Sequence, residues 1–143
     1  WDAGATRVDI TIPQKQGQQI VIEDNGSGMT DEEFRSRWMV IAYNRVDHQG
    51  EYIDFLASDN TKIRRLAYGR NGMGRHALVC FDEHYTIETW KDGTLNVYEV
   101  TVSEGNSVFS IEDHTQTSKI GSGTKIIVMR LNMFQSPQRL LKL

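Results

Sequence analysis

The chain has 143 residues and a formal net charge of −3, and its apolar (38%) and charged (24%) fractions are those of a globular protein. A chain of this size buries roughly 70% of the surface that it exposes when unfolded, which predicts one domain over residues 1–143. The mild acidity gives no reason to expect nucleic acid or an anionic membrane as a partner. No apolar run reaches the roughly 20 residues that cross a bilayer. With one cysteine, Cys80, expected in the core, the sequence favours a soluble cytoplasmic protein.

The first third of the chain predicts a strand pair and then a helix. Residues 1–6 resemble the end of a helix that passes through a glycine into a strand. Residues 7–12 and 19–23 are rich in β-branched side chains and predict antiparallel strands. Threonine and glutamate then stand three positions apart, as in a capping box, before apolar residues at helical spacing. We therefore expect a helix from about Asp31 to Tyr43.

The remainder predicts a long irregular segment, a second helix and four strands. Residues 44–71 show no sustained period, and such stretches in compact domains tend to be functional or mobile. A helix is expected from near Gly72 through Val79. Alternating segments over 84–90, 95–103, 107–113 and 124–131 predict strands, with hairpin turns at 91–93 and 104–106. The fold class expected is α+β, a two-layer sandwich with a mostly antiparallel sheet and helices on one face.

The first candidate site is the segment 23–29, where a strand ends in Asp24 before two glycines. A polar, glycine-rich turn would explain this composition equally well, because Asn-Gly is a common turn pair. The functional interpretation rests on the carboxylate, which only accepts hydrogen bonds and would suit the exocyclic amino group of adenine better than the carbonyl of guanine. Gly26 and Gly28 would leave room for a flat base, and Met29 would give it an apolar contact.

The second candidate is the segment 69–77, in which three glycines lead into the second predicted helix. Amides at a helix N-terminus offer donors and partial positive charge, so this entry predicts phosphate binding. The segment lacks the Gly-Lys-Ser/Thr ending of a P-loop and the glycine spacing of dinucleotide-binding folds. By itself it is also compatible with close packing of a helix. Arg70 and Arg75 could meet phosphates, although exposed arginines are commonly only solvated.

A third segment, 121–124, is a glycine turn before a strand and by itself indicates only structure. Taken together, Asp24-x-Gly26-x-Gly28, Gly69-x-x-Gly72-x-Gly74 and Gly123-Thr124 resemble three conserved blocks of the Bergerat-fold, or GHKL, ATPases. That family includes DNA gyrase B, the ninety-kilodalton heat-shock chaperones, MutL, the MORC proteins and the sensor histidine kinases. Its first block is a helix with Glu-x-x-x-Asn-Ala-x-Asp-Ala, whose end the residues 1–5 resemble. Chaperone-like and MORC-like members look most similar.

The resemblance implies a role for each matching residue. Asp24 would bind adenine, Thr124 would support the same base contact, and Asp2 would lie at the edge of the pocket. Residues 44–71 would form the lid over the nucleotide. The base pocket would be completed by Gly26, Gly28 and Met29, and the phosphates would be bound by Gly69, Asn71, Gly72, Met73, Gly74 and Arg75.

The resemblance also implies ATP or ADP as the ligand and Mg²⁺ as a cofactor. The catalytic glutamate and the magnesium-binding asparagine of the family are expected just upstream of Trp1, so the N-terminal helix is expected to be incomplete. No catalytic or metal-binding residue is therefore assigned within the sequence. Glu23 is a poor substitute, because in a strand its side chain points away from the face of Asp24. The intact protein is expected to hydrolyse ATP, and these 143 residues alone are not.

Three functions remain open from the sequence. The first is the ATP-binding domain of an ATPase whose turnover drives a conformational change in a larger protein, compatible with homodimerisation through regions outside this chain. The second is the ATP-binding module of a sensor histidine kinase, and the third is a non-catalytic nucleotide-binding module. A Glu-x-x-x-Asn pattern before Trp1 would support the first, a phosphoacceptor helix the second, and the absence of that pattern the third.

Overall fold

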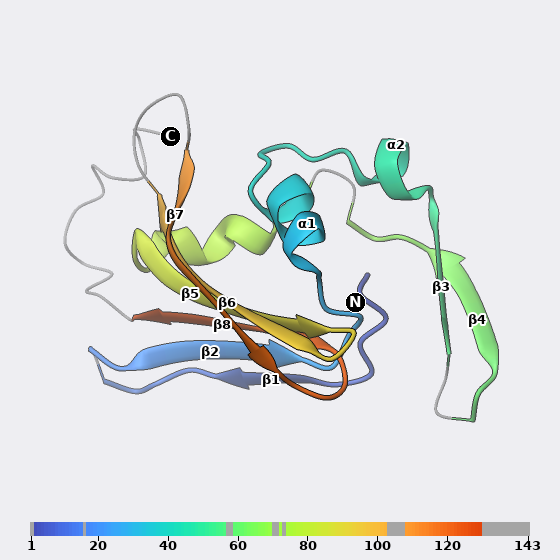
Figure 1. Cartoon of the computed structure of the whole chain (residues 1–143), viewed down its shortest axis with the longest axis horizontal. Helices are drawn as coiled ribbons and strands as arrows, with labels where there is room; N and C mark the ends of the chain where they lie inside the picture. Colours follow the sequence, from blue (N-terminus) through green and yellow to red (C-terminus); the bar gives the residue numbers. More distant parts are fainter. Residues whose placement is uncertain are drawn as a thin grey trace.

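The computed structural model describes residues 2–15, 17–56, 59–69, 72, 74–102 and 108–129. Its main feature is an antiparallel sheet of six strands in the order β1-β2-β8-β5-β6-β7. Short helical segments lie on one face of this sheet (Figure 1). The expected α+β arrangement is confirmed. The six strands are β1 (Val8–Thr11), β2 (Gln19–Asp24), β5 (His84–Lys91), β6 (Thr94–Val102), β7 (Phe109–Ser118) and β8 (Gly123–Met129).

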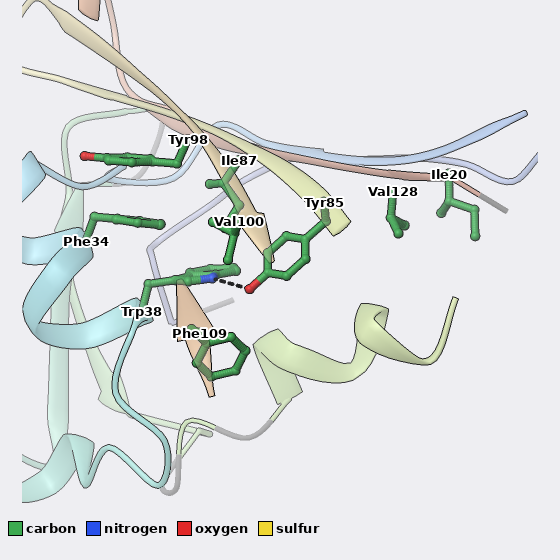
Figure 2. Packing of buried hydrophobic residues seen from close by; sticks show 9 residues of the cluster. All are labelled: Ile20, Phe34, Trp38, Tyr85, Ile87, Tyr98, Val100, Phe109 and Val128. Carbon is green, nitrogen blue, oxygen red and sulfur yellow. Dashed lines mark hydrogen bonds between the residues drawn. The ribbon is translucent and has the colours of Figure 1, made fainter. Parts of the chain in front are cut away.

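The core lies between this sheet and the helical segments, and aromatic rings fill much of it (Figure 2). The helical side contributes α1 (Asp31–Glu33), which continues into the π-helical turn η1 (Phe34–Trp38). The ring of Phe34 stacks on that of Tyr98 with centroids 3.7 Å apart. The indole Nε1 of Trp38 donates a hydrogen bond of 3.5 Å to the hydroxyl of Tyr85. Apolar area removed from water here holds the two layers together.

The predicted strand pairs are confirmed where the structure describes them. The turn at 91–93 has Asp92 and Gly93 with φ of 51° and 80°, as a tight two-residue hairpin requires. Strand β7 runs to Ser118, five residues past its predicted end, because its polar residues pair along the whole length of β6. The second predicted turn, 104–106, lies outside the described residues.

The helix predicted over 31–43 is too long. Its start is as predicted, since the side chains and backbones of Thr30 and Glu33 form the capping box. The helix ends at Trp38, and Ala42 adopts a left-handed φ of 54°. The guanidinium of Arg75 donates to the carbonyl of Val40 at 2.7 Å and also to the carbonyl of Arg37. A residue distant in sequence therefore satisfies carbonyls that another helical turn would have used.

The segment 44–71 is not irregular, although its sequence predicted no regular element. It contains the helix α2 (Arg45–Gln49) and a hairpin of β3 (Tyr52–Leu56) and β4 (Lys62–Leu66), which stands apart from the main sheet (Figure 1). Asp54 and Arg64 face each other across this hairpin and form an ion pair of 2.7 Å. Such charged cross-strand pairs interrupt the apolar pattern from which strands are predicted.

The second helix also differs from its prediction. It is the 3-10 helix η2 (Gly74–Cys80), which begins two residues later than expected. Cys80 is exposed at the end of this short helix, so its predicted place in the core is wrong. The prediction assumed an α-helix, whereas a 3-10 helix turns every three residues and places its side chains in different directions. Within the described ranges, no helix is long and apolar enough to cross a membrane.

Candidate nucleotide site

Polar side chains form a row at one end of the helix-covered face of the sheet. Backbone pairing places Asp24 of β2 opposite Thr124 of β8, and Thr124 opposite Thr89 of β5. Directly paired residues project from the same face, and so do residues two apart in one strand, such as Thr89 and the core residue Ile87. The three polar side chains therefore point toward the helices, beside the hydrophobic core.

The carboxylate of Asp24 is partly buried but keeps capacity to bind a donor. Its Oδ1 accepts a hydrogen bond of 2.8 Å from the backbone N–H of Gly26. Burial raises the pKa of Asp24 above its ordinary value, and the backbone amides of Gly26 and Thr124 act in the opposite direction. A carboxylate has about four lone-pair sites, so two amide donors leave room for a third.

Both glycines after Asp24 lie where other parts of the protein approach closely. A Cβ at Gly26 would lie 2.6 Å from Cβ of Ala3 and 2.8 Å from Oδ1 of Asp24, so glycine is needed for these groups to pack here. Gly28 has a φ of 61°, and a Cβ there would lie 2.0 Å from the carbonyl oxygen of Trp90. Gly28 is thus needed for packing of its loop on β5, which the assignment of both glycines to a base pocket did not anticipate.

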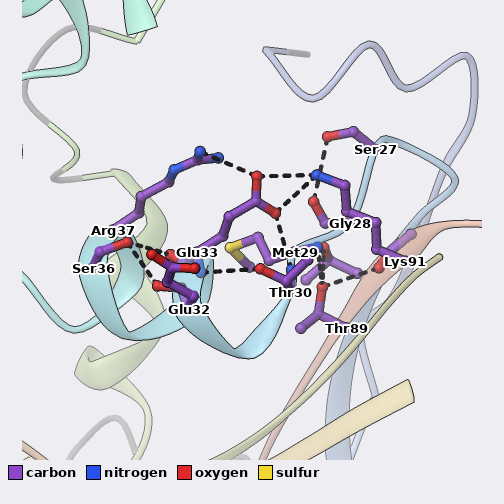
Figure 3. A network of polar contacts seen from close by, with 12 residues as sticks. Ser27, Gly28, Met29, Thr30, Glu32, Glu33, Ser36, Arg37, Thr89 and Lys91 are labelled. Atoms are coloured by element: carbon purple, nitrogen blue, oxygen red, sulfur yellow. Dashed lines mark hydrogen bonds and ion pairs between the residues drawn. The ribbon is translucent and has the colours of Figure 1, made fainter. Parts of the chain in front are cut away.

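A polar network attaches the loop after Asp24 to strand β5 (Figure 3). The backbone N–H of Met29 donates to Oγ1 of Thr89 at 2.8 Å. The N–H of Thr30 donates to Glu33, whose carboxylate also binds Nζ of Lys91 at 2.9 Å. The side chain of Met29 packs against the core, so its apolar surface lies next to the polar row. These contacts hold the end of the loop that follows Asp24 on β5.

Thr89 is a site residue that sequence reasoning missed. Its side chain is fully buried, and its hydroxyl lies 3.4 Å from that of Thr124. The available signal was a threonine at an inward position of a strand, two residues after Ile87. That signal is weak, because threonine is common in strands and its partners are distant in sequence.

Asp2 connects the Asp24 loop with the start of the glycine-rich segment 69–74. Its carboxylate accepts hydrogen bonds from the backbone N–H groups of Tyr68 at 2.9 Å and Gly69 at 2.6 Å. Burial alone would raise the pKa of Asp2, but these amides and nearby arginines lower it overall. The next residue, Ala3, accepts a hydrogen bond of 2.8 Å from the N–H of Ser27. Segments far apart in sequence therefore meet around Asp2.

Gly72 and Gly74, the other two glycines of this segment, differ in what surrounds them. Among the residues that the structure describes, no atom lies within 4 Å of a Cβ added at Gly74. A Cβ at Gly72 would lie 2.8 Å from the guanidinium of Arg75. That guanidinium also lies 6.0 Å from the ring centre of Trp38, and it donates to the carbonyls at the end of η1. The predicted site residues Asn71 and Met73, together with Arg70, lie outside the described residues.

Other features of the molecule do not join this site. Glu23 of β2 lies opposite Lys125 of β8, and Nζ of Lys125 forms an ion pair of 3.9 Å with Glu88 of β5. These three side chains project from the face of the sheet opposite Asp24. In the part of the chain that the structure describes, no group of three or more His, Cys, Asp and Glu residues could hold a metal ion. An apolar groove of about 410 Å³ is lined by η2 and the ends of β6 and β7 and includes neither Asp24 nor Thr124.

Sequence comparison finds a family model and several relatives that match this chain. A family model described as "Histidine kinase-, DNA gyrase B-, and HSP90-like ATPase" matches residues 1–125. The putative type II restriction enzyme HgiDII of Herpetosiphon aurantiacus is 30% identical over 139 residues, which cover 92% of this chain and 21% of that protein. The chaperone protein HtpG of Sulfurimonas denitrificans is 31% identical over 126 residues, covering 88% and 18%. The chain spans about a fifth of the length of these relatives.

Solved structures share the fold. The N-terminal domain of a DNA repair protein has a TM-score of 0.53 at 20% identity, covering 99% of this chain and 34% of that one. The ATPase region of topoisomerase II from Saccharomyces cerevisiae has a TM-score of 0.53 at 18% identity, covering 87% and 31%. At such identities these structures establish the architecture and leave residue roles to the geometry of the site.

Proposed function

Because this chain belongs to the histidine kinase-, DNA gyrase B- and HSP90-like ATPase family as an ATP-binding domain, we propose that Asp24 selects the adenine base. The exocyclic amino group of adenine donates to the Asp24 carboxylate, and Thr124 contacts the same edge of the base. The segment 69–74 receives the phosphates, with Asp2 at the edge of the pocket. These contacts bind ATP or ADP.

The observation that carries the adenine assignment is an acceptor-only side chain beside a hydroxyl. The Asp24 carboxylate faces the helix side of the sheet next to Thr124, and with its Oδ1 on the backbone N–H of Gly26 it keeps capacity to accept from a further donor. A charge-assisted hydrogen bond contributes roughly 1.5–3 kcal/mol, enough to prefer a base that donates at this position over one that accepts. Met29 and the core beside it supply an apolar surface for the ring.

The phosphate assignment rests on openness and charge. No described residue has an atom within 4 Å of a Cβ added at Gly74, so a ligand can approach the backbone closely there. The guanidinium of Arg75 lies next to Gly72 and brings positive charge close to this segment. The hydrogen bonds of its Nη2 go to backbone carbonyl groups, so it acts on the phosphates through its charge. The link between Asp2 and Gly69 holds the start of the segment near the Asp24 loop. The hairpin of β3 and β4, which directly precedes Gly69, is then placed to act as a lid.

Hydrolysis is the further part of this proposal. In the full-length protein the domain hydrolyses ATP, and the turnover drives a conformational change in the larger chain. Mg²⁺, when bound with the nucleotide, neutralises charge on the phosphates. The residues described here supply the base and phosphate contacts, and Glu23 contributes nothing to them because it projects from the other face of the sheet.

Calorimetric titration of the full-length protein with ATP and with GTP tests the adenine assignment. The wild-type protein should bind ATP in clear preference to GTP, and Asp24→Asn should bind ATP about tenfold to a hundredfold more weakly. Asp9→Asn, which alters an exposed carboxylate on the neighbouring strand β1, serves as the matched control and should bind like the wild type. Equal ATP affinity for wild type and Asp24→Asn would refute the assignment.

A further inference from the structure

The hydroxyl of Thr89 has no role in the contacts proposed so far, although Thr89 is fully buried and lies at the end of the row formed with Asp24 and Thr124. Valine has nearly the same shape, is at least as favourable in a strand and carries no polar atom to bury. A threonine here costs free energy unless its hydroxyl is well bonded, so its hydrogen bonds are where a function for the hydroxyl should be sought.

Three polar groups surround this hydroxyl. The backbone N–H of Met29 donates to Oγ1 of Thr89 at 2.8 Å. The carbonyl oxygen of Gly123 lies at 3.3 Å, and Oγ1 of Thr124 lies at 3.4 Å. Thr89 thus bridges the loop that follows Asp24 and the strand that carries Thr124, the two segments that would meet the base.

The hydroxyls of Thr89 and Thr124 have one proton each, and the direction of their mutual hydrogen bond decides whether Thr124 can donate to a ligand. A hydroxyl has one proton and two lone pairs, and Met29 uses one lone pair of Thr89. If Thr89 donates its proton to Gly123, its second lone pair can take the proton of Thr124, and Thr124 then offers only lone pairs. If Thr89 donates to Thr124, the proton of Thr124 is free to point into the pocket.

Adenine requires the second arrangement. Next to its exocyclic amino group the ring carries the nitrogen N1, which only accepts hydrogen bonds. With the amino group on Asp24, N1 faces Thr124, because these two residues are paired directly across β2 and β8. The base contact at N1 therefore needs a donor at Thr124.

We propose that Thr89 is a positioning residue for adenine recognition, which donates to Thr124 and so directs the Thr124 hydroxyl proton to N1 while it holds the Met29 loop on β5. This inference rests on the proposed function and assigns to it a residue that does not itself touch the nucleotide.

The test compares ATP with 1-deaza-ATP, in which a C–H replaces N1, by calorimetry on the full-length protein. The wild type should prefer ATP by about tenfold, roughly the value of one well-formed hydrogen bond. Thr124→Val, which removes the donor itself, should bring this preference close to one, and Thr89→Val, which leaves the Thr124 proton undirected, should lower it to a value between that and the wild type. Thr89→Ser, which keeps the hydroxyl, should retain the wild-type preference. Thermal unfolding of each variant checks that it is folded. If Thr89→Val does not fold, Thr89→Ala takes its place.

A merely structural role gives a different result. If Thr89→Val weakens ATP and 1-deaza-ATP by the same factor, or if the wild type does not distinguish them, the inference is overturned. Failure of the proposed function is recognised separately, because then the wild type does not bind ATP, or Asp24→Asn binds it as well as the wild type.

Discussion

Gly28 of segment 24–29 and Gly74 of segment 69–74 have different surroundings. At Gly28 the protein itself occupies the space next to the glycine, and a Cβ would overlap the carbonyl of Trp90. At Gly74, no atom of the described residues lies within 4 Å of an added Cβ. Two similar sequence patterns thus satisfy different needs.

This difference indicates that the fold requires glycine at position 28, whereas a bound ligand would require it at position 74. Substitution at Gly28 should act on folding, and substitution at Gly74 should act on binding while the fold is kept. Asp24 lies between these cases, since it is a partly buried charge that costs stability and that we propose is retained for its ligand.

The largest expected effect is on stability, from Gly28→Ala. The methyl group adds a backbone clash to the strain of a left-handed φ, so unfolding should require about 3 kcal/mol less free energy, or the variant should fail to fold. Thermal or urea unfolding measures this. Gly17→Ala is the matched control, because Gly17 has a φ of 76° but, among the described residues, no atom within 4 Å of an added Cβ. If the two variants lose the same stability, the clash at Trp90 is not what requires glycine at position 28.

The next effect is on nucleotide affinity, from Gly74→Val. The side chain enters free space, so the unfolding free energy should stay within about 0.5 kcal/mol of the wild type. ATP affinity should fall about tenfold, because the valine obstructs the phosphates. Adenosine, which has no phosphates, should bind both proteins alike in the same titrations. Unchanged ATP affinity in the folded variant would exclude this segment as the phosphate site.

The smallest effect is on the stability of the nucleotide-free protein, from Asp24→Asn. Because burial raises the pKa of Asp24, the folded protein holds this proton more tightly than the unfolded chain does. The stabilisation is present in acid and is lost as the pH rises through the folded-state pKa. The variant should therefore melt slightly higher than the wild type near neutral pH, and the difference should vanish in acid. A lower melting temperature for the variant at neutral pH would show that the charge is not a cost to the fold.

The sequence predicted those features that depend on residues close together in the chain. The capping box of Thr30 and Glu33 and the hairpin at Asp92 and Gly93 each depend on residues within a few positions of one another, and both are present as predicted. The order of the glycine-containing motifs in the sequence also indicated the family, because widely separated motifs rarely agree by chance.

What the sequence did not predict depends on distant partners. The helix after Thr30 ends at Trp38, where Arg75, 35 residues from Val40 in sequence, bonds to the carbonyl of Arg37 in the helix and to that of Val40 just after it. Thr89 was overlooked because its partner Met29 lies 60 residues away. Neither contact leaves a periodic or compositional signal, so only the folded arrangement identifies them.

The most direct test of the adenine assignment removes the donor from the ligand. Calorimetry on the full-length protein should compare ATP with the triphosphate of purine riboside, which lacks the exocyclic amino group, in wild type and Asp24→Asn. The wild type should prefer ATP by about tenfold or more, and Asp24→Asn should lose most of that preference. The same preference in both proteins would show that the amino group is recognised elsewhere and would contradict the role of Asp24.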